Sequence, residues 1–449
     1  MPTQHDDIVF LRGLRTKTVS VLLGASLLSL LSFGLPANAV GSWVTHDVTI
    51  RATGAPLVEP DIVIFAFASN LSREGPAGRV IYRSADNHIN ELKLVPSGWQ
   101  WQDLTRLLQP SVPPDRTSAL LAPDGEVPFG YVSNLPGRGP EARVVYRSAD
   151  GHIQELNFAP DLKWRWGDLT DRTGAPVAAP GASPLGYESN LAGQGPMARV
   201  VYHSTDGNIQ ELSLGSDFQW RRADPDLTKR TGAPDAVGLA TGFASNLAGQ
   251  GAAAHVVYVS ADGHVNELKA GGGLNEWRHT DLTVQTNGPM SRNPTVHGYT
   301  TNLSGQGQVA RVVYVSSHDN HVQELFRGAG GIWRRADLTA VALWPQVPPP
   351  QLVLVPKTPG LPVGYSTNLA GQGPVARVVF RDMATRNVWE LSVGSDGQWR
   401  GANLTARTGG GPLAVSEPFG YMTSLSGQVP TARVVFSTPE GHLQELSVS

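Results

Sequence analysis

Residues 128–176 read PFGYVSNLPGRGPEARVVYRSADGHIQELNFAPDLKWRWGDLTDRTGAP, and this stretch decides the fold. It holds four strand-like segments: the aromatic-centred PFGYVSNL, the β-branched run RVVY, HIQEL after an Asp-Gly turn, and a segment that begins at Trp164. Asp-Gly favours a two-residue hairpin, because both turn positions need a positive φ. Four antiparallel strands in about 50 residues is the size of one propeller blade.

The same unit recurs along the chain, and a Glu-Leu pair marks each copy. Successive glutamates lie 64, 56, 56, 57, 66 and 55 residues apart: Glu91, Glu155, Glu211, Glu267, Glu324, Glu390 and Glu445. β-Branched alternation, with Gly or Pro every few residues, excludes helical repeats. The sequence therefore predicts an all-β fold, a seven-bladed β-propeller with four-stranded antiparallel blades.

The fourth strand has the pattern W-x-x-x-[DN]-[LV]-T and follows six of the Glu-Leu pairs. Its tryptophans are Trp99, Trp164, Trp220, Trp277, Trp333 and Trp399. The seventh copy lacks it, whereas WVTHDVT stands at residues 43–49, at the other end of the chain. We therefore expect the N-terminal strand to complete the last blade and close the ring.

The N-terminal residues 1–39 have the features of a secretory signal peptide. Arg12, Arg15 and Lys17 precede an apolar run over residues 19–35, and Ala-Asn-Ala at 37–39 gives a cleavage site. A retained membrane anchor is the alternative, but an apolar run of about 17 residues is at the lower limit for a span. We expect a secreted protein.

The mature chain, residues 40–449, is expected to form a single propeller domain. Two Pro-rich insertions, at about 106–126 and 341–360, interrupt the repeat, which resumes in register after each. They are therefore expected to be surface loops between blades.

Composition limits the chemistry. The formal net charge is −3, with no basic block, which argues against a nucleic-acid partner. Cysteine is absent, so disulfides, thiolate metal sites and cysteine nucleophiles are excluded. Turn histidines recur on separate hairpins, too far apart to share one metal ion, and turn capping explains them: His88, His152, His264, His321 and His442. We predict no catalytic residue, metal or cofactor.

An arginine opens the second strand of six blades, with His255 in the fourth, and a glutamate follows 12 or 13 residues later. Since the two strands form a hairpin, each pair should lie within reach. Two interpretations stay open: an internal ion pair, which costs desolvation when buried, or a sugar-binding pair that donates to and accepts from hydroxyls. The pairs are Arg79/Glu91, Arg143/Glu155, Arg199/Glu211, Arg311/Glu324, Arg377/Glu390 and Arg433/Glu445.

The tryptophans divide into two groups. The repeat tryptophan of each fourth strand is expected in the core between neighbouring blades, with its indole N–H bonded locally. Trp101 and Trp166 lie two residues further on, in the first two blades only. They share a face with the repeat tryptophan and are expected to contact a ligand or cover an edge.

The order Arg-Val-Val-Tyr, Asp-Gly turn, Glu-Leu strand and Trp strand resembles the fucose-binding β-propeller lectins of fungi and bacteria, over residues 41–449. The resemblance implies a non-catalytic sugar-binding protein with glycan partners. In that family an Arg and a Glu of one blade bind the sugar, and aromatic side chains of the same groove and the adjoining blade stack on it. It therefore nominates the six pairs above. Trp101, Trp166, Trp389 or the first-strand aromatics would supply the wall, for fucose-like, other neutral or methylated sugars.

Two other classes compete with a lectin. A propeller glycoside hydrolase or lyase would break the symmetry and place two carboxylates about 5–10 Å apart at one site, and no blade has a unique Asp, Glu and His cluster. A protein-binding scaffold would use the exposed loops. A hydrolase should have one catalytic pocket, a lectin several similar shallow ones, and a scaffold none.

Overall fold

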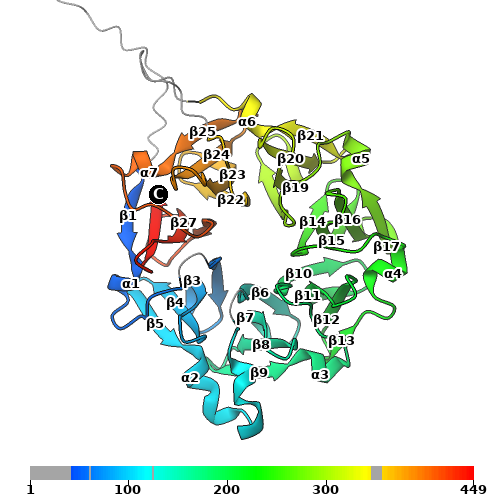
Figure 1. The fold of residues 1–449 in the computed structure, drawn as a ribbon, viewed down its shortest axis with the longest axis vertical. Helices are drawn as coiled ribbons and strands as arrows, with labels where there is room; N and C mark the ends of the chain where they lie inside the picture. Colours follow the sequence, from blue (N-terminus) through cyan, green and yellow to red (C-terminus); the bar gives the residue numbers. More distant parts are fainter. Residues whose placement is uncertain (1–41, 60–61, 124–125, 345–355) are drawn as a thin grey trace, which may run out of the picture. The chain divides into compact units, whose positions relative to one another are not determined.

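A computed structural model describes residues 42–59, 62–123, 126–344 and 356–449, which form seven four-stranded antiparallel sheets arranged in a ring (Figure 1). The chain is a seven-bladed β-propeller, as predicted. Blade 1 consists of β2 (Phe65–Leu71), β3 (Gly75–Arg83), β4 (Ile89–Val95) and β5 (Gly98–Asp103), and blade 2 of β6 (Phe129–Leu135), β7 (Gly139–Arg147), β8 (Ile153–Phe158) and β9 (Trp164–Asp168). Blade 3 consists of β10 (Leu185–Leu191), β11 (Gly195–His203), β12 (Ile209–Leu214) and β13 (Trp220–Arg222), and blade 4 of β14 (Thr241–Leu247), β15 (Gly251–Val259), β16 (Val265–Gly271) and β17 (Leu274–Asp281). Blade 5 consists of β18 (His297–Leu303), β19 (Gly307–Val315), β20 (Val322–Arg327) and β21 (Arg334–Asp337), and blade 6 of β22 (Val363–Leu369), β23 (Gly373–Arg381), β24 (Val388–Val393) and β25 (Arg400–Asn403).

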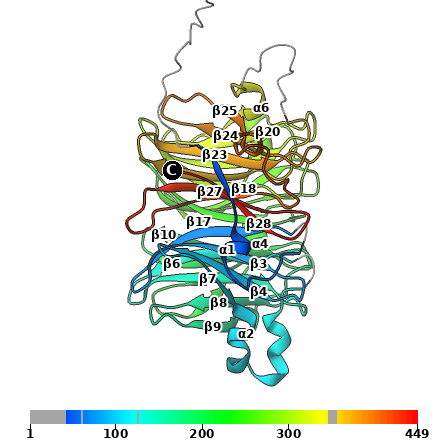
Figure 2. The same ribbon diagram turned by 90° about the vertical axis from the view of Figure 1, so that its left-hand side faces the viewer.

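The seventh blade joins the two ends of the described chain. Its strands are β26 (Phe419–Thr423), β27 (Thr431–Ser437), β28 (Leu443–Val448) and β1 (Val44–Asp47). β1 pairs antiparallel with β28, with His46 opposite Glu445, and the Leu443 amide donates to the Thr49 hydroxyl at 2.7 Å. Figures 1 and 2 show the blue β1 beside the red C-terminal blade. The predicted ring closure is confirmed.

The fourth strands end earlier than the sequence pattern suggested. In the described residues each Asp or Asn of the D-L-T motif caps a short helix: α1 (Val48–Arg51), α2 (Leu104–Leu108), α3 (Leu169–Thr173), α4 (Leu227–Thr231), α5 (Leu282–Thr286), α6 (Leu338–Val341) and α7 (Leu404–Arg407). Asp168, for example, accepts the Asp171 amide at 2.9 Å, as an N-cap does. The hydroxyl of Thr170 accepts the Ile153 amide at 2.8 Å. The motif therefore clamps the third strand to the fourth.

The first Pro-rich insertion is more ordered than the expected loop. It contains two 3₁₀ helices, η1 (Gln109–Ser111) and η2 (Pro114–Leu120), and Leu120 is buried between blades 1 and 2. In the second insertion, Trp344 packs edge-on against Trp389 at 5.7 Å, whereas residues 345–355 lie outside the described residues, as does the proposed signal peptide. No helix in the described ranges has the length and apolar character needed to cross a membrane.

Neighbouring blades pack through one hydrophobic cluster per interface. At six of the seven interfaces, a first-strand aromatic ring lies on a glycine of the next blade, as Tyr131 lies on Gly186, where a Cβ would collide with the ring. The same contact recurs at Gly130, Gly242, Gly298, Gly364 and Gly420, whereas the interface between blades 7 and 1 has Ala66 at this position. The close approach therefore explains the recurring glycine before the aromatic residue at those six interfaces.

Replacing Gly242 by alanine should destabilise the fold, because the new methyl group collides with the ring of Tyr187. Overpacking of this kind costs about 1–3 kcal/mol, so thermal unfolding should show a lower Tm than in the wild type. Gly330→Ala is the matched control, since a methyl group added there would have no other atom within 4 Å. Equal losses of Tm in the two variants would contradict this account of the motif.

The innermost strand of each blade faces the axis of the ring (Figure 1). Aromatic side chains of four of these strands, β2, β6, β18 and β26, lie close together. The Phe65 ring lies edge-on to Phe129 at 4.3 Å and to Phe419 at 4.9 Å, and His297 lies 6.1 Å from Phe419. The Gly364 amide donates to His297 Nδ1 at 3.2 Å. Burial among these rings lowers the pKa of His297 from its ordinary 6.5 to about 4.

Stability should depend on pH through this histidine. Between pH 6.5 and about 4 the unfolded chain binds a proton at His297 that the folded protein does not. The stabilisation that the fold gains from a neutral His297 is therefore fully present above pH 6.5 and is lost as the pH falls towards 4. His297→Leu should remove this dependence of stability on pH. Leucine is the residue at the matching position of blade 3, Leu185. Parallel plots of Tm against pH for the two proteins would show that His297 contributes nothing.

Candidate functional site

Each predicted Arg–Glu pair is part of a three-residue arrangement across one blade. In blade 3, Arg199 of β11 lies between Ser189 of β10 and Glu211 of β12: Nε donates to Ser189 Oγ at 2.6 Å and Nη1 donates to Glu211. The other five arginines bond a serine or threonine and a glutamate in the same way, with Nε–Oγ distances of 2.6–2.9 Å. The predicted adjacency is confirmed. The Ser/Thr partner was missed, although its position recurs in the first-strand motif.

Both members of each pair are buried. Arg143 is 1% exposed and Glu155 is 5% exposed, and the other pairs are similar. Burial raises the pKa of Glu445 above its ordinary range, against the opposing effect of Arg433. In blade 4 burial is outweighed by hydrogen bonds from His255 and Trp333, and the pKa of Glu267 is lowered. The pairs are therefore internal ion pairs, as one of the two interpretations requires.

Removing the glutamate of an ion pair should lower the stability of the fold. Glu155→Ala removes the acceptor of Arg143 Nη1 and of the Trp220 indole N–H, and leaves Glu141 as the remaining carboxylate partner of the buried guanidinium. A buried donor left unsatisfied costs about 1–3 kcal/mol, so the urea midpoint should fall. Asp161→Ala is the control in the same blade, because Asp161 pairs with Arg165 in an exposed ion pair and its loss should change the midpoint little. A Glu155→Ala midpoint equal to that of the control would show that the ion pair is dispensable to the fold.

The repeat tryptophan of one blade reaches the ion pair of the blade before it. Trp220 Nε1 donates to Glu155 Oε2 at 3.2 Å, and Trp333 Nε1 donates to Glu267 Oε2 at 3.0 Å. The tryptophan therefore lies between blades, as predicted, but in these two blades its N–H bonds across the interface and not locally. In blades 3 and 5 the arginine lies 6.0 Å from the centre of the next tryptophan ring: Arg199 over Trp277 and Arg311 over Trp399.

Three grooves lie on blades 3, 5 and 7 and are named by their blades, and the linings of grooves 3 and 7 include the ion pair. Groove 3, of about 420 Å³, is lined by Arg199, Glu211, Ser213 and Trp277 of the next blade. Groove 7, of about 540 Å³, is lined by the corresponding residues Arg433, Glu445, Ser447 and Trp99, and also by His46. Groove 5, of about 290 Å³, is lined by Val309, Phe326 and Ile332. A buried ion pair is therefore the floor of at least grooves 3 and 7.

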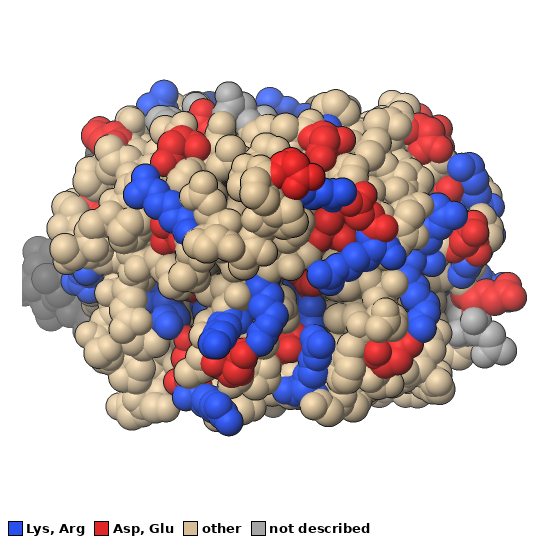
Figure 3. Space-filling view, turned by 90° about the horizontal axis from the view of Figure 1, so that it is seen from below, with Lys and Arg blue, Asp and Glu red and all other residues tan. Residues whose placement is uncertain are grey.

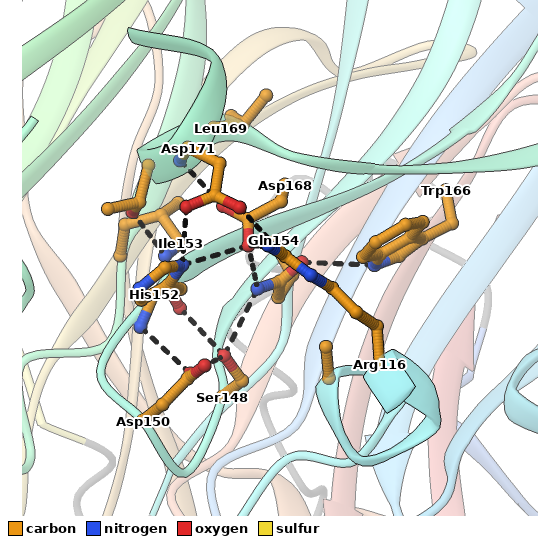
Figure 4. A network of polar contacts seen from close by, with 12 residues as sticks. Arg116, Ser148, Asp150, His152, Ile153, Gln154, Trp166, Asp168, Leu169 and Asp171 are labelled. Atoms are coloured by element: carbon orange, nitrogen blue, oxygen red, sulfur yellow. Dashed lines mark hydrogen bonds and ion pairs between the residues drawn. The ribbon is translucent and has the colours of Figure 1, made fainter. Parts of the chain in front are cut away.

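Trp101 and Trp166 share a face with the repeat tryptophans, as predicted, but line none of these three grooves. Their indole N–H groups are bonded within their own blades, each at 3.0 Å: Trp101 to Asn90, and Trp166 to Gln154, as Figure 4 shows. Both pack against the hydrophobic clusters between blades. A sugar contact for either residue stays a prediction.

The turn histidines bond the aspartates that cap the short helices. His152 Nδ1 lies 2.8 Å from Asp168 Oδ2 (Figure 4), and the same contact recurs in four other blades: His88–Asp103, His264–Asp281, His321–Asp337 and His442–Asp47. Two groups have metal-like spacing, His152/Asp168/Asp171 and Asp319/His321/Asp337. In the first, the Arg116 guanidinium pairs with both aspartates. The histidines thus hold the turn against the helix cap.

The edge of the ring seen in Figure 3 carries basic and acidic side chains side by side. Several exposed arginines pair with an aspartate four residues away, including Arg221 with Asp217 at 2.5 Å and Arg400 with Asp396 at 2.6 Å. This face offers no continuous positive surface, in keeping with the absence of a basic block in the sequence.

The fold and the repeated grooves define a seven-bladed propeller with similar sites between blades. No protein-family model matches the sequence, and no curated protein matches it. Among solved structures, the BP39L lectin from Burkholderia pseudomallei is 16% identical with a TM-score of 0.56, over 86% of this chain and 96% of that chain. The Aleuria aurantia lectin in complex with alpha-methyl-L-fucoside is 13% identical (TM-score 0.47; 77% and 96%), and AofleA from Arthrobotrys oligospora is 13% identical (0.47; 80% and 89%). The similarity to BP39L supports the propeller fold.

Proposed function

We propose that the protein is a secreted, non-catalytic lectin that binds fucose-like, other neutral or O-methylated sugars in several grooves between its blades. The observation that carries the proposal is the combination in grooves 3 and 7: a guanidinium and a carboxylate from one blade beneath a tryptophan from the next. The likeness to BP39L, itself a lectin, supports the class of protein. Secretion rests on the pattern of residues 1–39.

The chemistry of these groups suits a sugar. The guanidinium donates and the carboxylate accepts hydrogen bonds, which matches adjacent hydroxyl groups. The indole ring offers a flat apolar face for the C–H side of the sugar. Since the ion pair and the Ser/Thr bond already fix the arginine, little side-chain entropy is lost on binding. The two interpretations of the Arg–Glu pairs are therefore compatible: the same pair supports the blade and contacts the ligand.

The arrangement favours a binder over an enzyme. Grooves 3 and 7 repeat the same residues in different blades, which matches several similar sites and not one catalytic pocket. In a multivalent lectin, single weak sites on one rigid ring can gain roughly 10²–10⁴ in apparent affinity on a dense glycan surface. No observation specifically favours a protein-binding scaffold.

A glycan array tests the proposal. The mature protein, residues 40–449, should be retained by fucosylated or O-methylated glycans, and retention should fall steeply when the same glycan is printed at low density, because avidity is then lost. Mass spectrometry of the glycans after incubation is the control for hydrolysis. Failure to retain every carbohydrate probe, or release of cleaved sugar, would refute the lectin function.

A further inference from the structure

The seven blades are not equivalent around the position of the arginine. They fall into three groups by the residue that lies directly opposite this position on the third strand. In blades 3, 6 and 7 this residue is a serine; in blades 1, 2 and 4 it is a longer polar residue; and in blade 5 it is a phenylalanine. In blade order the residues are Lys93, Asn157, Ser213, Lys269, Phe326, Ser392 and Ser447.

In blades 1 and 2 a second carboxylate takes the remaining donor of the arginine. Arg79 Nη2 pairs with Glu74, which also accepts from Lys93 at 2.9 Å. Arg143 Nη2 pairs with Glu141, which accepts from Asn157 at 2.9 Å. All three nitrogens of each guanidinium are thus bonded inside the protein, and the two arginine side chains are 0% and 1% exposed. Because the arginine is buried and each of its nitrogens already has a partner, these blades expose no guanidinium nitrogen to a ligand.

Blade 4 is filled in another way. His255 replaces the arginine and is bonded at both ring nitrogens, to Ser245 at 2.7 Å and to Glu267 at 2.6 Å. The second oxygen of Glu267 accepts from Trp333. The polar atoms that would hold a hydroxyl group are therefore already paired.

Blades 3, 6 and 7 leave the arginine available. Arg199 and Arg377 are each 5% exposed at the side chain and Arg433 is 10% exposed. In blades 3 and 6 the outer amino group bonds neutral side chains among the described residues: Gln194 at 2.9 Å and the Met197 sulfur at 3.5 Å in blade 3, and Gln372 at 3.1 Å in blade 6. In blade 7 no described residue accepts a hydrogen bond from Arg433 Nη2. A ligand hydroxyl can displace a neutral amide far more easily than a buried carboxylate.

We infer that three of the seven blades, blades 3, 6 and 7, bind sugar hydroxyls at their Arg–Glu pairs, and that blades 1, 2 and 4 are closed by their own side chains. Blade 5 is excluded because Phe326 stands opposite its arginine and lines groove 5 together with Val309 and the exposed Ile332. The inference rests on the proposed function. On this inference, Glu74 and Lys93 close the site of blade 1. Gln194 and Ser213 occupy the same two positions at the open site of blade 3.

Exchanging these residues between blades tests the inference with arrangements that the chain already folds. Gln194→Glu with Ser213→Lys places the closing pair of blade 1 in blade 3, and Glu74→Gln with Lys93→Ser does the reverse. Native mass spectrometry of the mature protein with methyl α-L-fucoside and its 2-O-methyl derivative should count three bound sugars in the wild type. It should count two in the first variant and four in the second.

Asp161→Ala, in an exposed ion pair away from grooves 3 and 7, is the control and should keep three sugars. Tm values near that of the wild type show that the exchanges preserve the fold. Unchanged counts in both exchange variants, or a wild-type count other than three, would overturn the assignment of open and closed blades while leaving the lectin intact. Absence of binding by the wild type, together with a negative array, would refute the proposed function itself.

Discussion

The contact between an aromatic ring of one blade and a glycine of the next governs the rest of this molecule. At six of the seven interfaces it sets how closely neighbouring sheets approach, because a Cβ at the glycine would collide with the ring as the sheets now stand. That separation in turn brings the tryptophan of one blade to the carboxylate of the blade before it, as Trp220 reaches Glu155. The grooves are therefore a product of sheet packing and need no loop of their own.

Periodicity in the sequence was sufficient for the number of blades, the order of strands and the closure by residues 43–49. It also placed each arginine beside its glutamate, because a hairpin fixes which residues face each other. It could not show that Trp333 reaches Glu267, 66 residues away, since contacts between sheets depend on their separation. For the same reason the sequence left open whether the ion pairs are internal and gave no sign of the helix that each Asp or Asn of the D-L-T motif caps: both are decided by neighbours that the local pattern does not contain.

The ion pairs illustrate how one interaction can serve two purposes. A buried pair adds little net stability, because desolvation offsets most of its Coulomb energy, yet six of the seven blades keep an Arg–Glu pair. The value of such a pair to a binding surface is rigidity: donors and acceptors are already oriented before a ligand arrives. Differences among the blades then come from the second layer of residues, such as Glu74 in blade 1 and Gln194 in blade 3.

The pairing of β1 with β28 joins residues 394 positions apart, as in the bond between Leu443 and Thr49. Contacts of such long sequence separation form late in folding, since the entropy of closing the loop must be overcome first. The closing blade is thus expected to be the last to assemble. Once formed, it leaves neither end of the described chain as an unpaired strand, so removing a blade from either end first requires β1 and β28 to separate.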